Sequence, residues 1–294
     1  MKRVHFFGAA LVAMLTLSFA PSQNLCEGFL PENDMKIPIR LQMVEGGGLN
    51  QAQFNAVLDR LTEVYGPIIE AQGGHLSISR QWTNDTVNAS AQRFGDTYQL
   101  NMYGGLARHP AINEDGFMLV ACHETGHHLG GAPKVSGWFS TWASNEGEAD
   151  YFAGLKCLRR VWTAEDNSKF MQDNEATLDP FMLQKCREAW STVEEINLCA
   201  RIGAAGMRVT ALFKDLSQED QEPRYDTPDT HRVSQTDDSH PATQCRLDTY
   251  FQSGLCIKSV DDALSDSDVA RGACVEADGF TMGVRPRCWY GETP

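Results

Sequence analysis

The chain has 294 residues, which is long enough for one large domain or two small ones. Its formal net charge of −14 at pH 7 argues against nucleic acid or an anionic membrane as a partner, because both carry negative charge themselves. Acidic chains are common among secreted hydrolases, so the charge alone indicates no particular function.

The first residues have the pattern of a secretory signal peptide. Lys2 and Arg3 precede an apolar run at 6–19, and Ala-Pro-Ser at 20–22 resembles a cleavage site. The apolar run is short for a membrane span, and no similar run follows it. We therefore expect a soluble, exported protein, periplasmic or secreted, with no stable membrane insertion.

The patterns that follow predict an α+β fold. An alternating stretch at 37–44 predicts a first strand, and Asn50 predicts the N-cap of a helix with an apolar face. Residues 217–244 have no apolar periodicity and predict a long loop. The other expected elements are strands at 76–79 and 97–103, a helix through residue 123, and helices from Glu146 to about Trp162, Asp179 to Trp190, and Val193 to about Leu216.

The strongest chemical signal is the H-E-x-x-H pattern at 123–127. On a helix, His123 and His127 lie on one face and can bind one zinc ion, with Glu124 placed as the base of a metal-activated water. The alternative is a polar, solvated helix face. Residues 117–121 are all apolar and lead directly into the motif, which indicates a buried helix instead. Gly130-Gly131 predicts the end of this helix.

A third zinc ligand is expected at the start of the next helix. Glu146 and Asp150 are one helical turn apart, so Glu146 can bind zinc while Asp150 holds the free ring nitrogen of a histidine ligand. Acidic residues also favour helix N-termini for electrostatic reasons alone. Glu148 is a competing ligand, although it lies on another face of this helix.

The nine cysteines all follow the predicted signal peptide, which indicates disulfides in an oxidising compartment. Because nine is odd, at least one thiol is free or pairs between chains. We expect Cys122 to be free, since it lies in the apolar part of the motif helix. The connectivity is open, but four cysteines near the C-terminus are expected to pair among themselves and three are expected to clamp helices: Cys245, Cys256, Cys274 and Cys288, and Cys157, Cys186 and Cys199.

Several stretches together resemble one family of zinc peptidases, which includes HtpX heat-shock proteases, CAAX prenyl proteases and periplasmic peptidases of outer-membrane quality control. The stretches occur in the family's order over roughly residues 85–247. They are Val87-Asn88-Ala89-Ser90-Ala91, Tyr103-Gly104-Gly105-Leu106, the H-E-x-x-H motif, Glu146-Gly147-Glu148-Ala149-Asp150, and His240-Pro241 with Arg246.

The resemblance implies a zincin-like α+β domain of the gluzincin type, with one Zn²⁺ per chain. It implies that His123, His127 and Glu146 are the ligands and that Glu124 is the general base. Asp150 would orient a ligand. The remaining implied roles are His240 and Arg246 acting on the tetrahedral intermediate, or His240 capping zinc at rest, and Asn88, Ala89, Tyr98 and Leu100 binding substrate, with 97–103 as the edge strand that pairs with an extended peptide.

The sequence departs from the family at its C-terminus, where a Cys-rich stretch stands in place of membrane helices or helical repeats. Thermolysin-like enzymes share the ligand spacing but lack the arrangement of His240-Pro241 and Arg246. The predicted organisation is a signal peptide at 1–22, a metallopeptidase domain at 23–244 and a disulfide-stapled extension at 245–294.

The predicted function is an exported zinc endopeptidase acting on polypeptide substrates. The alternative is a catalytically silent or latent protein of the same fold, which binds unfolded or partner proteins and carries a structural zinc. The sequence indicates no oligomeric state.

Overall fold

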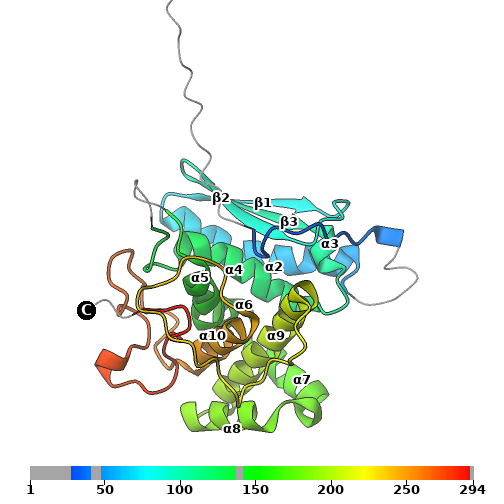
Figure 1. Cartoon of the computed structure of the whole chain (residues 1–294). Coiled ribbons are helices and arrows are strands. Elements are labelled where there is room, and N and C mark those ends of the chain that lie inside the picture. The colour runs from blue at the N-terminus through cyan, green and yellow to red at the C-terminus, as the bar shows by residue number, and fades with distance from the viewer. Residues whose placement is uncertain (1–27, 41–47, 137–141, 292–294) are drawn as a thin grey trace, which may run out of the picture.

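The computed structural model describes residues 28–40, 48–136 and 142–291, so the predicted signal peptide and Cys26 lie outside the described residues. A small sheet covers two long helices, and the helices that follow these two in the chain lie on their other side with the C-terminal stretch (Figure 1). The predicted α+β class, with a small sheet, a helical part and disulfide-bonded cysteines, is confirmed.

The sheet has three strands, β1(His75–Gln81), β2(Ala89–Phe94) and β3(Thr97–Tyr103), in the order β1-β3-β2. β3 pairs parallel with β1 and antiparallel with β2. The expectation that 97–103 is an edge strand is therefore wrong, because both sides of β3 are paired. β2 was not anticipated, since its sequence Ala-Ser-Ala-Gln-Arg-Phe has little intrinsic strand preference. The strand forms where fully buried Ala89 and Ala91 contribute to the main core.

The strand expected at 37–44 does not form in its described part. Lys36 makes an isolated bridge to Thr86, and the Ile37 amide donates to the Asp85 carbonyl at 2.9 Å. Pro38 has no N–H group to continue a ladder, and the chain is helical at 39–40. Residues 41–44 lie outside the described residues.

Two helices lie directly beneath the sheet, and both begin where the sequence indicates. α2(Gln51–Ala71) has the N-cap Asn50, which forms a reciprocal capping box with Gln53. α4(Glu114–Leu129) carries the H-E-x-x-H motif and has the N-cap Asn113. It ends at Gly130-Gly131, as predicted, where Gly131 takes a φ of +77° that favours glycine.

The second motif helix approaches α4 closely. It comprises α5(Glu146–Phe152), the π-helical segment η1(Ala153–Cys157) and α6(Leu158–Val161), which confirms the expected helix from Glu146 to about Trp162. A Cβ atom on Gly126 of α4 would lie 2.8 Å from the Ala149 carbonyl oxygen of α5. This glycine therefore permits the spacing that brings the two motifs together.

The remaining helices were only partly anticipated. α8(Pro180–Ala189) and α9(Val193–Ser217) match the expected helices, and a long irregular stretch follows α9. The sequence does not indicate α10(Thr243–Leu255), because this helix follows a loop-like sequence and its N-cap residue, Ala242, makes no side-chain hydrogen bond. The elements that the sequence did not indicate are α3(Gly104–Ala107), α7(Ala164–Asn174), η2(Glu175–Thr177), α10(Thr243–Leu255) and η3(Glu276–Asp278).

Four disulfides connect the helices and the C-terminal stretch. Cys122 on α4 is bonded to Cys157 in η1, so the expectation that Cys122 is free is wrong. The close packing of the two motif helices brings these Cα atoms to 5.5 Å, which is within the range for a disulfide. The other bridges are Cys186–Cys199, Cys245–Cys288 and Cys256–Cys274, of which the last two confirm pairing within the C-terminal stretch.

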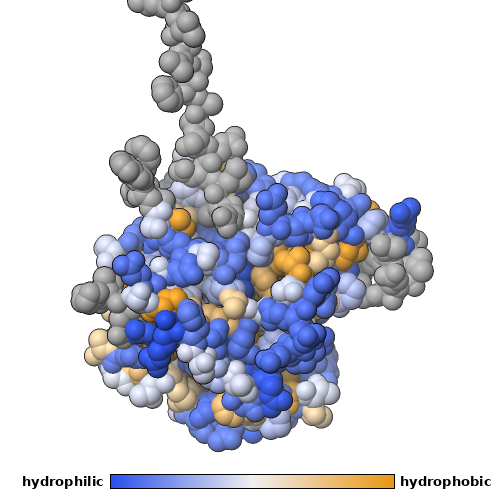
Figure 2. Space-filling view, viewed as in Figure 1, coloured by the Kyte–Doolittle hydropathy of each residue, from blue (hydrophilic) through white to orange (hydrophobic). Residues whose placement is uncertain are grey.

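The disulfides are typical of proteins from oxidising compartments. Among the described helices, none has the length and apolar character to cross a membrane. Figure 2 shows a mostly hydrophilic face on which apolar side chains gather in a few places.

The C-terminal stretch packs directly against α5. Arg285 and Glu148 form a buried ion pair, with Nε to Oε2 at 2.5 Å and Nη2 to Oε1 at 2.8 Å. Gly147 faces the Trp289 ring, where a Cβ atom would lie 2.1 Å from a ring carbon. Glu148, the competing ligand candidate, thus anchors the C-terminal stretch to the helix that begins with Glu146.

Replacing Arg285 with Met should lower the free energy of unfolding by about 3–5 kcal/mol, because the Glu148 carboxylate stays buried without its counter-charge. Urea denaturation of the oxidised protein measures this change. The double variant Arg285→Met/Glu148→Gln should recover part of the loss, and purely additive losses would contradict the pairing.

Candidate metal centre

Three side chains from the two motif helices converge in the interior. His123 Nε2 and His127 Nε2 are 3.1 Å apart, and the Glu146 carboxylate oxygens lie 3.3 Å from His123 Nε2 and 3.5 Å from His127 Nε2. All three side chains are buried. Among the described residues, this cluster of donor atoms can hold a metal ion, and its members are the three ligands expected from the sequence.

The hydrogen bonds of the two rings determine which nitrogen faces the cluster. His127 Nδ1 donates to the Ser144 carbonyl oxygen at 2.8 Å, because a carbonyl can only accept. His123 Nδ1 lies 2.7 Å from Asp150 Oδ1 and donates to that carboxylate. In the neutral rings both Nε2 atoms therefore carry lone pairs directed into the cluster, as two ligands of one metal ion would.

The spacing of the donor atoms fits a tetrahedral ion. Typical Zn–N and Zn–O bonds place neighbouring ligand atoms about 3.4 Å apart in a tetrahedral site. The three observed separations, 3.1, 3.3 and 3.5 Å, bracket that value. Two imidazoles and one carboxylate are also a ligand set of catalytic zinc sites, in which a fourth position stays open.

Burial and neighbouring charges shift the pKa values of the ligands. Burial lowers the pKa of His127 to about 4. Burial also opposes the charged forms of His123 and Glu146, but their partners outweigh it. Asp150, followed by Glu146, raises the pKa of His123 to about 9, and the two histidines lower that of Glu146 to about 2. The Glu146 carboxylate is therefore ionised, as a metal ligand must be.

Glu124 is fully buried on α4, and neither of its carboxylate oxygens has a hydrogen-bond partner among the described residues. A buried carboxylate without a partner is unfavourable, and burial raises the pKa of Glu124 to about 8. A cation in the adjacent cluster would favour its ionised form. These orphaned oxygens are the second observation that fits a metal ion at this site.

Asp150 connects three helices behind His123. Its Oδ1 atom accepts from His123 Nδ1 at 2.7 Å, from Arg246 Nη2 at 2.6 Å and from Tyr250 Oη at 2.7 Å. Arg246 and then His123 hold the pKa of Asp150 below its usual range, although burial opposes this. Tyr250 was not singled out from the sequence, although it lies one helical turn after Arg246 on α10.

Arg246 and His240 occupy different positions relative to the cluster. Arg246 is fully buried, and its guanidinium contacts Asp150 and the Phe29 carbonyl oxygen, so it lies behind the ligands. His240 Nε2 lies 3.5 Å from Glu146 Oε2, at the side of the cluster. The same nitrogen donates to the Gly28 carbonyl oxygen at 2.7 Å, which places its proton on Nε2 instead of leaving a lone pair for a metal.

The residues expected to bind substrate separate into two groups. Asn88 and Ala89 lie at the start of β2, on its outer edge, where both contact the chain at Phe29–Leu30. Tyr98 and Leu100 belong to the central strand β3, and Leu100 is fully buried in the core. Their main chain already pairs with two strands, so the structure does not offer it to a peptide.

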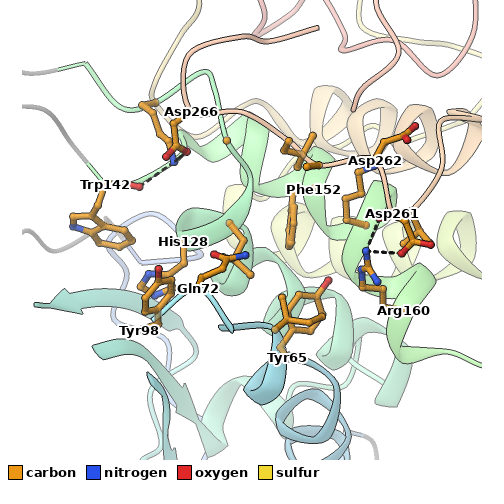
Figure 3. A pocket seen from close by; sticks show the side chains of 18 of the residues that line it. Tyr65, Gln72, Tyr98, His128, Trp142, Phe152, Arg160, Asp261, Asp262 and Asp266 are labelled. Carbon is orange, nitrogen blue, oxygen red and sulfur yellow. Dashed lines mark hydrogen bonds and ion pairs between the residues drawn. The ribbon is translucent and has the colours of Figure 1, made fainter. Parts of the chain in front are cut away.

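His128, the third histidine of the motif region, is directed toward the sheet instead of the ligand cluster. Its ring lies 4.9 Å from the Tyr98 ring and stacks on Trp142 at 4.6 Å. Figure 3 shows these three rings at one side of a cavity of about 510 Å³, whose opposite wall includes Arg160 and Asp261. Burial lowers the pKa of His128 to about 3, so this ring is neutral. The loop between the two motif helices has two more aromatic residues, Trp138 and Phe139, which lie outside the described residues.

Replacing Asp150 with Asn should weaken zinc binding by about 10- to 100-fold, because His123 loses the carboxylate that fixes its tautomer. Competition with a chromogenic chelator measures the affinity. Tyr250→Phe is the milder matched variant, since it removes one hydrogen bond and leaves both charges in place. Unchanged affinity in a folded Asp150→Asn protein would show that the orientation of His123 does not depend on Asp150.

The contribution of Glu124 to the stability of the metal-free protein should fall as pH rises from about 5 to about 8. In this window the folded protein keeps a proton on Glu124, whose pKa is about 8, whereas the unfolded chain has released it. Glu124→Gln should remove up to about 1.4 kcal/mol per pH unit of this slope. Urea titrations of chelator-treated protein test this, and identical slopes for both proteins would rule out a protonated Glu124.

Comparison of the chain with protein-family models, curated proteins and solved structures finds no match. The properties of the site are therefore inferred from its own residues alone. It is a buried His₂Glu cluster that can hold a metal ion, beside a buried carboxylate that has no partner among the described residues.

Proposed function

We propose that the chain is an exported zinc-dependent endopeptidase of zincin-like fold. The observation that carries this proposal is Glu124. Both of its carboxylate oxygens are buried and unpartnered among the described residues, one position along α4 from the ligand His123. A site that only stabilises the fold has no use for such a carboxylate, whereas a hydrolytic site needs a base at this position.

Each of these residues has a defined role in the proposed mechanism. His123, His127 and Glu146 would hold the ion, which when bound supplies Lewis acidity and lowers the pKa of water. Glu124 takes the proton of the attacking water and passes it to the leaving amine. His240 donates a hydrogen bond from Nε2 to a carbonyl oxygen of the bound peptide, as it does here to Gly28. Asp150 keeps the His123 ring oriented.

The compartment and the substrate class are part of this proposal. The disulfides support an oxidising compartment, and the apolar run at 6–19 supports export. The substrate would be a polypeptide that lies against the outer edge of β2, because Asn88 and Ala89 already bind the main chain of Phe29 and Leu30 there.

Replacing Glu124 with Gln should lower the rate of casein hydrolysis by about 10²-fold or more while the zinc content stays at one per chain. The amide keeps the size of the side chain but cannot accept a proton from water. Glu114→Gln is the matched control, because Glu114 is an exposed carboxylate in the first turn of the same helix. Equal hydrolysis by wild type and Glu124→Gln would refute the proposed mechanism.

A further inference from the structure

The chain at Gly28–Leu30 lies against the outer edge of β2 and bends at Phe29 and Leu30. The Phe29 amide donates to the Ala89 carbonyl oxygen at 2.9 Å. The Asn88 side chain binds both main-chain groups of the next residue, accepting from the Leu30 amide at 2.9 Å and donating to its carbonyl at 3.1 Å. Farther along the chain, Lys36 forms an antiparallel bridge with Thr86, and the Ile37 amide donates to the Asp85 carbonyl oxygen. The chain from Phe29 onward therefore runs antiparallel to residues 85–89.

The Phe29 side chain fills a pocket that one metal ligand helps to form. Its ring lies 4.9 Å from the His123 ring and 5.2 Å from the Phe213 ring. The Arg246 guanidinium carbon lies 4.7 Å from the ring centroid, and Nη1 donates to the Phe29 carbonyl oxygen at 3.2 Å. Phe29 is fully buried, so the aromatic side chain and its carbonyl are both bound next to the candidate metal centre.

The residue before Phe29 is bound by a histidine that lies beside the cluster. His240 Nε2 donates to the Gly28 carbonyl oxygen at 2.7 Å and lies 3.5 Å from Glu146 Oε2. Four residues therefore hold the segment. Asn88 and Ala89 lie at the start of β2, His240 lies in the long loop, and Arg246 lies on α10. A segment that only packed into the hydrophobic core would not need a hydrogen bond from a histidine beside the ligand cluster.

We infer that Gly28–Leu30 is an intramolecular pseudo-substrate that occupies the peptide-binding groove of the metal centre. This inference rests on the proposed function. It specifies the ligand class as a peptide with a large aromatic residue in the pocket beside His123 and Phe213, followed by a residue whose main chain binds the Asn88 side chain. A peptide in solution must compete with a tethered segment, whose effective concentration is in the millimolar range or higher. The full chain is therefore latent until this segment moves away.

The test compares peptide binding by full-length chains in which the segment is loosened. The probe is a fluorescein-labelled hexapeptide, Glu-Gly-Phe-Leu-Pro-Glu, which repeats residues 27–32. All proteins carry Glu124→Gln, so that binding is measured without hydrolysis. Fluorescence anisotropy should show at least tenfold tighter binding when Phe29→Ala is added, because the pocket is then open. The same peptide with Ser in place of Phe should bind at least tenfold more weakly to that variant.

A second variant loosens the segment without creating a cavity. A Cβ atom on Gly28 would lie 2.6 Å from Asn88 Nδ2, so Gly28→Ala should displace the segment and also tighten peptide binding. Phe54→Ala is the control, because Phe54 is equally buried but lies on α2, among Trp82 and Phe117. This control should lose stability without any gain in peptide binding.

The outcomes separate this inference from the proposed function. No gain in binding for Gly28→Ala, in a folded protein that retains zinc, would overturn the pseudo-substrate. Casein cleavage that wild type and Gly28→Ala perform at the same rate would also overturn it, while supporting the peptidase. Peptide binding by the loosened variants, without cleavage by any protein that retains Glu124, would support the groove and reject the peptidase.

Discussion

The Asp150 carboxylate is the point on which the site depends. It is fully buried where α4, α5 and α10 meet, and one of its oxygens accepts hydrogen bonds from His123, Arg246 and Tyr250. A charge at this depth is tolerated only when it is paired and hydrogen-bonded, so the three helices must keep their relative positions. The orientation of the His123 ring toward Glu146 is a direct consequence of that constraint.

Close packing supplies the rest of the geometry. Gly126 lets α5 approach α4. The Cys122–Cys157 bridge then joins α4 covalently to η1, which continues α5. On the other side of α5, the C-terminal stretch contributes the Arg285 pair to Glu148 and the Trp289 ring. The Cys-rich stretch thus functions as a wall behind the helix that begins with a metal ligand. This packing helps to keep the charged side chains of the two motif helices in the interior.

The groove and the centre are closed by the chain itself. Phe29 excludes solvent from one side of His123, while His240 holds the preceding carbonyl beside the ligand cluster. In the proposed latent form, the residues that would bind a peptide are paired with an internal one, so the polar groups of the proposed groove are not left unpaired in the absence of substrate. Under this proposal, the same contacts would stabilise the resting state and select peptides with an aromatic residue.

The sequence alone determined the local features of the candidate metal centre. The spacing of His123, Glu124 and His127 on one helix, and the capped helix that begins with Glu146, depend on helical periodicity and capping, which act over a few residues. The sequence also indicated α2, α8 and α9, because each has an apolar face and an N-cap residue whose side chain binds the first turn. Tertiary structure alone decided which strand lies at the edge, which partner Cys122 takes and what Arg246 contacts, because these depend on pairings between distant segments. Strand order is set by packing against helices, and no local pattern records that Phe29 fills the pocket beside His123.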